Sequence, residues 1–86
     1  MAKIRLSTHA RKEYERLARS DRRLFRRVDR ALDRIAAEPG AGKPLVGPLK
    51  GRRSYRVASL RIIYRWHRGE CLVLVLDIAE RGRVYR

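Results

Sequence analysis

The sequence predicts an α+β fold in which a helical hairpin packs on a small, mostly antiparallel sheet, in the order β-α-α-β-β-β. Three observations lead to this prediction. A short alternating segment comes first, two amphipathic helical stretches follow it, and strand-like segments make up the second half of the chain after a loop rich in proline and glycine. Since 86 residues can build one hydrophobic core only, we expect a single domain over residues 1–86.

The N-terminal segment predicts a short, half-buried strand, because Ile4 and Leu6 alternate with basic residues. The apolar residues that follow, between 9 and 18, recur at helical spacing. Ser7 or Thr8 can cap this first helix, and we expect Ser20 to cap the second.

The second helix is expected to end at about Glu38, because Pro39 and Gly40 follow directly. One of its faces is apolar and the opposite face carries arginines interleaved with acids. Charged residues on a helix usually do no more than solvate an exposed face, so we assign these arginines no binding role. They are Arg23, Arg26, Arg27, Arg30 and Arg34.

Residues 39–49 predict a loop, and three strand patterns follow it. The first two alternate around residues 55–57 and 60–66. The third, over 71–79, is apolar except for Asp77, which predicts a central strand covered on both faces, with Cys71 as a core thiol. Between the last two strands we expect a hairpin turn in which Gly69 takes the positive φ.

The composition restricts the classes of function. There are 23 Lys and Arg against 9 Asp and Glu, a net charge of +14, which points to a polyanionic partner. A 44% share of apolar residues excludes a disordered polycation, and no apolar run is long enough to cross a bilayer. One cysteine and no recognisable signal peptide favour a cytoplasmic protein without membrane contact.

The cations are not spread evenly, because seven lie between residues 50 and 68 with no acid among them. If Leu60 and Ile62 pack under the helices, Arg61 and Arg65 point to the opposite sheet face, and Arg56 on the neighbouring strand can join them. Like charges so placed repel one another unless an anion lies between them. The expected phosphate-binding residues are Lys50, Arg52, Arg53, Arg56, Arg61 and Arg65.

The C-terminal residues add Arg81, which directly follows the last strand, and Tyr85, which can exchange a proton or stack on a base. His9 and His67 have no second ligand at metal spacing, so we expect no metal and no cofactor. Nothing in the sequence favours small-molecule catalysis.

Several of these residues form a pattern that resembles the RelE group of the RelE/ParE toxin superfamily. Its most specific parts are the strand motif from Arg61 to Tyr64 and the terminal motif of Arg81 with Val84-Tyr85, and the resemblance covers nearly the whole chain. The other matching residues are Pro39, Gly42-Lys43-Pro44-Leu45, Gly47-Pro48-Leu49-Lys50-Gly51, Tyr55-Arg56-Val57 and Leu60.

The resemblance implies the toxin of a bacterial type II toxin–antitoxin pair. RelE-like members cut mRNA in the ribosomal A site, by attack of a ribose 2′-OH on the adjacent phosphate without a metal. It implies that Arg61 and Arg81 stabilise the phosphorane, that Tyr85 stacks on a base or moves a proton, and that Arg56 holds the RNA backbone.

Two positions depart from the family pattern. Ala58 stands where members can carry a second lysine, and Glu80 stands where a histidine or basic residue is common. Arginine is a poor general base, so three alternatives stay open: the toxin is slow, Tyr85 or Glu80 supplies the base, or the ribosome supplies much of the alignment.

Three functions remain open on the sequence: a ribosome-dependent mRNA endonuclease, which we expect first, a ParE-like poison of DNA gyrase, and a non-catalytic RNA-binding module. The implied partners are a cognate antitoxin, the ribosome and mRNA, with DNA contacted only through the antitoxin.

Overall fold

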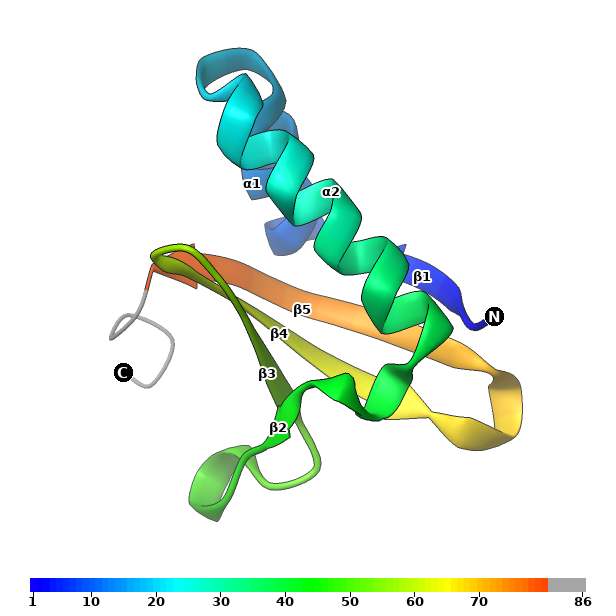
Figure 1. Cartoon of the computed structure of the whole chain (residues 1–86). Helices are drawn as coiled ribbons and strands as arrows, with labels where there is room; N and C mark the ends of the chain where they lie inside the picture. The colour runs from blue at the N-terminus through cyan, green and yellow to red at the C-terminus, as the bar shows by residue number, and fades with distance from the viewer. Residues whose placement is uncertain (81–86) are drawn as a thin grey trace.

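The computed structural model describes residues 1–80 and confirms the predicted fold class, with two helices on a mixed sheet (Figure 1). No helix among these residues is long and apolar enough to cross a membrane. Arg81 and Tyr85 lie outside the described residues. The elements are β1 (Lys3–Leu6), α1 (Thr8–Ser20), α2 (Arg22–Ala37), β2 (Lys43–Pro44), β3 (Arg53–Val57), β4 (Leu60–His67) and β5 (Leu72–Glu80), with short 3-10 turns η1 (Pro39–Ala41), η2 (Gly47–Leu49) and η3 (Arg68–Glu70).

The sheet has five strands in the order β1-β5-β4-β3-β2, and both helices lie on one of its faces (Figure 1). β1 pairs in parallel with β5, whereas the other three pairs are antiparallel. β5 therefore lies between β1 and β4 inside the sheet, as its apolar sequence predicts. Within residues 1–80, the opposite sheet face carries no helix.

Each helix begins at a side-chain cap. Ser7 Oγ accepts a hydrogen bond from the backbone N–H of Ala10 at 3.0 Å, which satisfies a free donor of the first turn of α1. Asp21 Oδ1 accepts from Leu24 N–H at 3.1 Å and so caps α2. The predicted Ser20 cap is wrong, because the Ser20 hydroxyl donates instead to the Arg16 carbonyl of its own helix.

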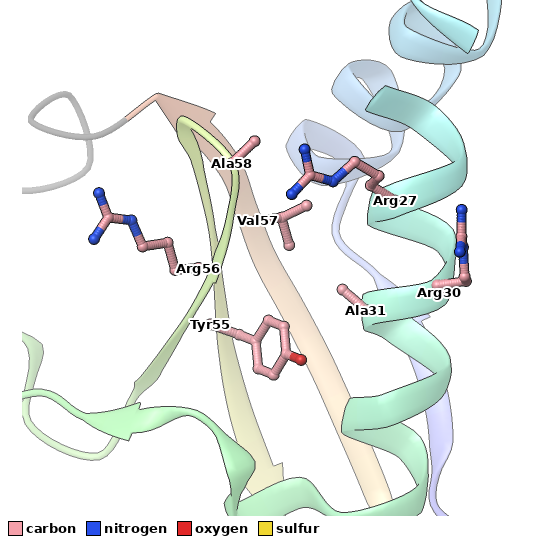
Figure 2. Close-up of a pocket in the computed structure, with 7 residues that line it drawn as sticks. All are labelled: Arg27, Arg30, Ala31, Tyr55, Arg56, Val57 and Ala58. Carbon is pink, nitrogen blue, oxygen red and sulfur yellow. The ribbon is translucent and has the colours of Figure 1, made fainter. Parts of the chain in front are cut away.

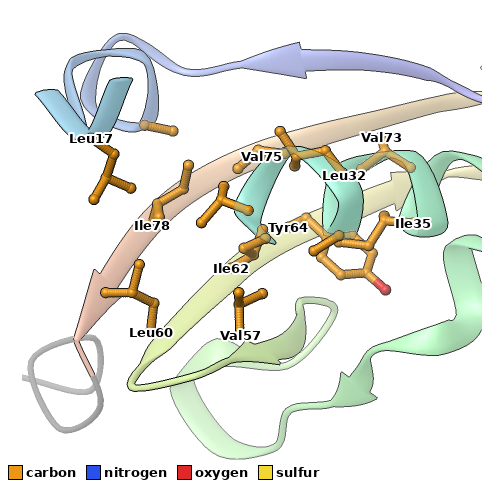
Figure 3. Packing of buried hydrophobic residues seen from close by; sticks show 13 residues of the cluster. Leu17, Leu32, Ile35, Val57, Leu60, Ile62, Tyr64, Val73, Val75 and Ile78 are labelled. Carbon is orange, nitrogen blue, oxygen red and sulfur yellow. The ribbon is translucent and has the colours of Figure 1, made fainter. Parts of the chain in front are cut away.

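The hydrophobic core fills the space between α2, α1 and the covered face of the sheet (Figure 3). Val28 and Ile35 of α2 are completely buried against Ile62, Val73 and Val75 of the central strands. This packing fixes which face each β4 residue occupies.

A β-bulge interrupts β5 at Leu76. Ile63 pairs with Asp77 and Tyr64 pairs with Val75, so Leu76 is an extra residue without a register partner on β4. The bulge shifts the alternation by one residue, which places Ile78 on the same core face as Val75. Simple alternation over 71–79 could not predict it.

Three expectations for the β4–β5 region are wrong. Gly69 is not the residue with positive φ, because η3 continues through residue 70 and Cys71 adopts φ 49° as it closes this turn. Cys71 is accordingly exposed rather than a core thiol. β5 is not covered on both faces, since Leu72, Leu74 and Leu76 are only half-buried, whereas Val73 and Val75 are completely buried.

The segment predicted as a loop, residues 39–49, contains the two-residue strand β2. Hydrogen bonds from Tyr64 hold the first part of this segment in place. The completely buried Tyr64 hydroxyl donates to the Pro39 carbonyl at 2.7 Å and accepts from Gly42 N–H at 2.8 Å. A methyl group at Gly42 would lie 2.5 Å from that hydroxyl, so only glycine fits here. The Tyr64 of the strand motif therefore has a structural role in this chain.

Candidate polyanion-binding face

Arg56 and Arg61 are direct cross-strand partners on β3 and β4. Figure 2 shows Arg56 pointing away from α2, whereas Tyr55 and Val57 on either side of it point toward the helix. Arg61 lies on the same helix-free face, because residues 60 and 62 on either side of it are buried in the core. Two arginines therefore converge on the open face of the sheet.

The surroundings of this pair restrict its position. Arg61 is half-buried, and its Nη1 donates to Ser54 Oγ at 3.2 Å. Ser54 and Ile63, which pair with each other on the same face, are only 5% and 2% exposed. Arg56 is exposed. Directly opposed side chains have Cβ atoms about 5 Å apart, so an anion between the two guanidiniums would relieve their repulsion.

Arg65 shares this face but lies farther along β4. It is exposed, and at about 3.3 Å per residue it lies about 13 Å from Arg61. A methyl group at Gly51 would lie 3.5 Å from Arg65 Nη2, so the connection after η2 runs beside this end of the face. The exposed Lys50 belongs to the same connection.

The structure separates Arg52 and Arg53 from the arginine pair. Arg53 is the register partner of Tyr64, whose side chain is in the core, and its Nη1 donates to the Gly42 carbonyl at 2.8 Å. Arg52 lines a different hollow, next to Trp66. The residues predicted to bind RNA therefore divide between two places on the molecule.

Glu80 does not share the face of the arginine pair. It lies opposite the buried Leu60, whereas its neighbour Ala79 lies opposite Arg61. A hydrogen bond and the charge of Glu13 raise the pKa of Arg16 on α1, and the charge of Glu80 adds to this effect. The Glu80 carboxylate thus lies on the side of α1. It is poorly placed to act as the general base for a substrate held by Arg61.

Sequence reasoning missed a second basic hollow, of about 290 Å³, between α2 and β3 (Figure 2). Arg27 and Arg30 line it from the helix and Tyr55 from the strand. In Figure 2 the Arg27 guanidinium points toward the strand rather than away from the protein. The sequence could have indicated this hollow, because these two arginines lie close to Ala31, at the border of the apolar face of the second helix.

His9 also has a contact that the sequence did not indicate. Its Nε2 lies 2.8 Å from Oδ1 of Asp77, which ties the first turn of α1 to the bulged part of β5. Within residues 1–80 no group of three or more His, Cys, Asp or Glu side chains could hold a metal ion.

A small α+β protein with paired arginines on a helix-free sheet face has the kind of surface that attracts polyanions. Comparison with known families makes this description specific. The family model described as the ParE toxin of the type II toxin–antitoxin system, parDE, matches residues 4–85. The chain therefore belongs to this toxin family, within the RelE/ParE superfamily.

Solved structures agree with this assignment. A YoeB/ParE toxin from Agrobacterium tumefaciens is 25% identical, with a TM-score of 0.81 over 92% of this chain and 98% of that one. The toxin–antitoxin complex RelBE2 from Mycobacterium tuberculosis contains a chain that is 31% identical, with a TM-score of 0.78 over 93% and 98%. The isolated RelE toxin of E. coli, 16% identical, shares the fold with a TM-score of 0.76 over 99% and 92%. Comparison with curated sequences finds no match.

Proposed function

We propose that this toxin is a ribosome-dependent mRNA endonuclease whose substrate phosphate lies between Arg56 and Arg61. The observation that carries the proposal is the in-register pairing of these two arginines on the open sheet face. Two guanidiniums offer bidentate donors to a phosphate from two sides, and both stay charged at any physiological pH.

The chemistry this site suits is the cleavage of RNA by its own ribose. The 2′-oxygen attacks the adjacent phosphorus and the bond from phosphorus to the 5′-oxygen breaks, which leaves a cyclic phosphate and a free 5′-hydroxyl. Negative charge builds on the non-bridging oxygens in the transition state, where Arg61, held by Ser54, would stabilise it.

The two proton transfers need groups other than these arginines, because a guanidinium neither takes nor gives a proton readily. We assign proton transfer or base stacking to Tyr85 and a second phosphate contact to Arg81, as the family resemblance implies. Alignment by the ribosome would supply part of the rate enhancement.

A cognate antitoxin is the proposed regulatory partner, since solved relatives include the toxin–antitoxin complex RelBE2. An antitoxin segment that carries acidic side chains would associate rapidly with a chain of net charge +14. If a small open reading frame adjoins the gene, co-expression with it should relieve growth arrest and yield a stable complex.

Primer extension on an mRNA under translation tests the proposed activity. The protein made by cell-free synthesis should create new 3′ ends at codons in translated mRNA, and none when translation initiation is blocked. Intact transcripts in a reaction in which the protein nevertheless stops protein synthesis would contradict the proposal.

DNA gyrase is the second candidate target, favoured by the ParE description of the matching family and by Ala58 in place of a family lysine. Gyrase supercoiling of relaxed plasmid separates the two candidates. Inhibition at protein concentrations that leave translated mRNA intact would favour gyrase, and normal supercoiling at excess protein would exclude it.

A further inference from the structure

Another basic cavity, of about 200 Å³ and separate from the hollow between α2 and β3, lies where β4 runs past the first residue of β3. β3 pairs only with residues 60–64 of β4, so the last three residues of β4 lack a partner on that side. The cavity is small for a drug-sized molecule but has room for one planar ring or one phosphate. The residues that line it are Pro44, Gly51, Arg52, Arg53, Trp66 and Arg68.

Trp66 and Arg68 form a stacked pair at this cavity. The Cζ atom of Arg68 lies 4.3 Å from the centre of the Trp66 ring, and Trp66 is half-buried whereas Arg68 is exposed. Aromatic rings and guanidinium planes are the surfaces on which unpaired RNA bases stack.

The electrostatics of the cavity favour a phosphate beside such a base. Three arginines line it, and residues 39–69 contain no Asp or Glu. Arg53 is held in place, because its Nη1 donates to the carbonyls of Gly42 at 2.8 Å and Gly40 at 3.4 Å. Arg52 and Arg68 therefore remain the cations that can adjust to a ligand.

We propose that this cavity binds one nucleotide of single-stranded RNA, whose base stacks on Trp66 and Arg68 and whose phosphate contacts Arg52. A protein carboxylate would use the charge but not the planar pair, which is why we infer RNA rather than an acidic peptide. The inference rests on the proposed RNA-directed function and adds a second contact to it.

The cavity is distinct from the Arg56–Arg61 pair. Trp66 follows Arg61 by five residues on β4, about 16 Å along the strand, and an odd number of residues places the two side chains on opposite faces. RNA bound at one site therefore does not occupy the other.

The single tryptophan of the chain makes the test direct, because Trp66 fluorescence reports on this cavity alone. We would titrate the full chain with a short adenine-rich oligoribonucleotide and expect saturable quenching. Arg68→Gln and Arg52→Gln should each weaken the affinity about five- to tenfold, which corresponds to about 1–1.4 kcal/mol. Arg26→Gln, on the exposed face of α2, should leave this titration unchanged.

Further probes decide what the cavity recognises. An mRNA-like strand and a single-stranded ribosomal RNA loop, used separately, identify which RNA binds more tightly, and stronger quenching by either supports the inference. Equal quenching by inorganic phosphate alone, or binding of a polyglutamate peptide in preference to RNA, would overturn it. So would unchanged RNA affinity in Arg68→Gln and Arg52→Gln. Quenching by RNA without any mRNA cleavage would leave the cavity assigned and refute only the endonuclease activity.

Discussion

Arg56 and Arg61 oppose each other across two hydrogen-bonded strands, so two positively charged side chains stand at directly opposed positions of the sheet. Like charges at directly opposed sheet positions destabilise the fold. Natural proteins tolerate such local losses of stability where function needs them. The pair is thus a position at which binding and stability should oppose each other.

Replacing Arg56, the exposed arginine of the pair, should therefore stabilise the fold. Arg56→Gln should raise the free energy of unfolding by about 0.2–1 kcal/mol at low salt, and by less at high salt because ions screen the repulsion. Urea unfolding at two ionic strengths measures it. Arg26→Gln, on the exposed face of α2, is the matched control and should change stability little. A clear loss of stability in Arg56→Gln would contradict the account.

Tyr64 and Gly42 form the other decisive contact at this scale. Gly42→Ala should destabilise the protein by about 1–3 kcal/mol, because the added methyl would overlap the buried Tyr64 hydroxyl. Gly40→Ala is the matched control, since a methyl there would make only ordinary contact with Trp66, at 3.9 Å. Chemical denaturation of both variants tests the prediction, and equal stabilities would refute it.

Alternation predicts the outward direction of Arg56 and Arg61, because the residues on either side of each arginine are apolar or aromatic. It could not predict the role of Tyr64, since a tyrosine in an apolar strand reads as ordinary core. The hydroxyl partners lie more than twenty residues away in the sequence. Contacts of this range come from tertiary packing and leave no local pattern.

At the scale of secondary-structure elements, Ser7 connects β1, α1 and β5. It caps α1, and its hydroxyl donates to the carbonyl of the bulged Leu76 at 2.8 Å, directly after β1 ends. The single residue therefore fixes the entry of α1 against the irregular part of β5.

Removing the Ser7 hydroxyl should destabilise the fold more than the loss of such a small group usually does. Ser7→Ala should lower the free energy of unfolding by about 0.5–2 kcal/mol for the cap, with a further contribution from the unpaired carbonyl. Ser20→Ala removes an exposed hydroxyl at the end of the same helix and should cost much less. Thermal unfolding of the two variants compares them, and the reverse order would show that Ser7 has no special role.

Tyr14 connects the two helices and gives the fold a dependence on alkaline pH. Its hydroxyl donates to Asp29 Oδ1 at 2.7 Å and its ring contacts Phe25. Burial first, and then the hydrogen bond and charge of Asp29, raise the pKa of Tyr14 to about 12. The folded chain thus favours neutral Tyr14 more than the unfolded chain does.

The stabilisation from Tyr14 is complete below its unfolded pKa of about 10 and is lost as the pH rises toward 12. The wild-type protein should therefore exceed Tyr14→Phe in unfolding free energy at neutral pH, and the difference should shrink between about pH 10 and 12. Urea unfolding of both proteins across this range measures it. A difference that stays constant would contradict the assignment.

The helix hairpin, the order of the elements along the chain and the central position of β5 follow from the hydrophobic pattern of the sequence, whereas the order of the strands in the sheet does not. The conformation of the turn after β4 could not be predicted from the sequence pattern. A glycine usually marks positive φ, yet here a 3-10 turn continues past Gly69 and leaves Cys71 in that conformation. The Leu76 bulge likewise depends on how β5 packs against β4 and on Ser7, which no local pattern encodes.

At the scale of the whole molecule, the excess charge is divided by the sheet. Arg56, Arg61 and Arg65 lie on the helix-free face, and the Trp66 cavity lies at the end of β4 with its aromatic ring on the other face. A hollow between α2 and β3 carries two further arginines. Within residues 1–80, these arginines thus lie in three separate places on the molecule.

The central claim, that the Arg56–Arg61 pair holds the cleaved phosphate, is tested most directly by mRNA cleavage in a reconstituted translation reaction with two variants of equal charge. Arg56→Gln/Arg61→Gln removes the pair, and Arg22→Gln/Arg26→Gln removes two exposed arginines of α2. We predict that the first variant loses about 10²-fold or more in cleavage rate while remaining folded, and that the second cleaves like the wild-type protein. Equal cleavage by the two variants would contradict the claim.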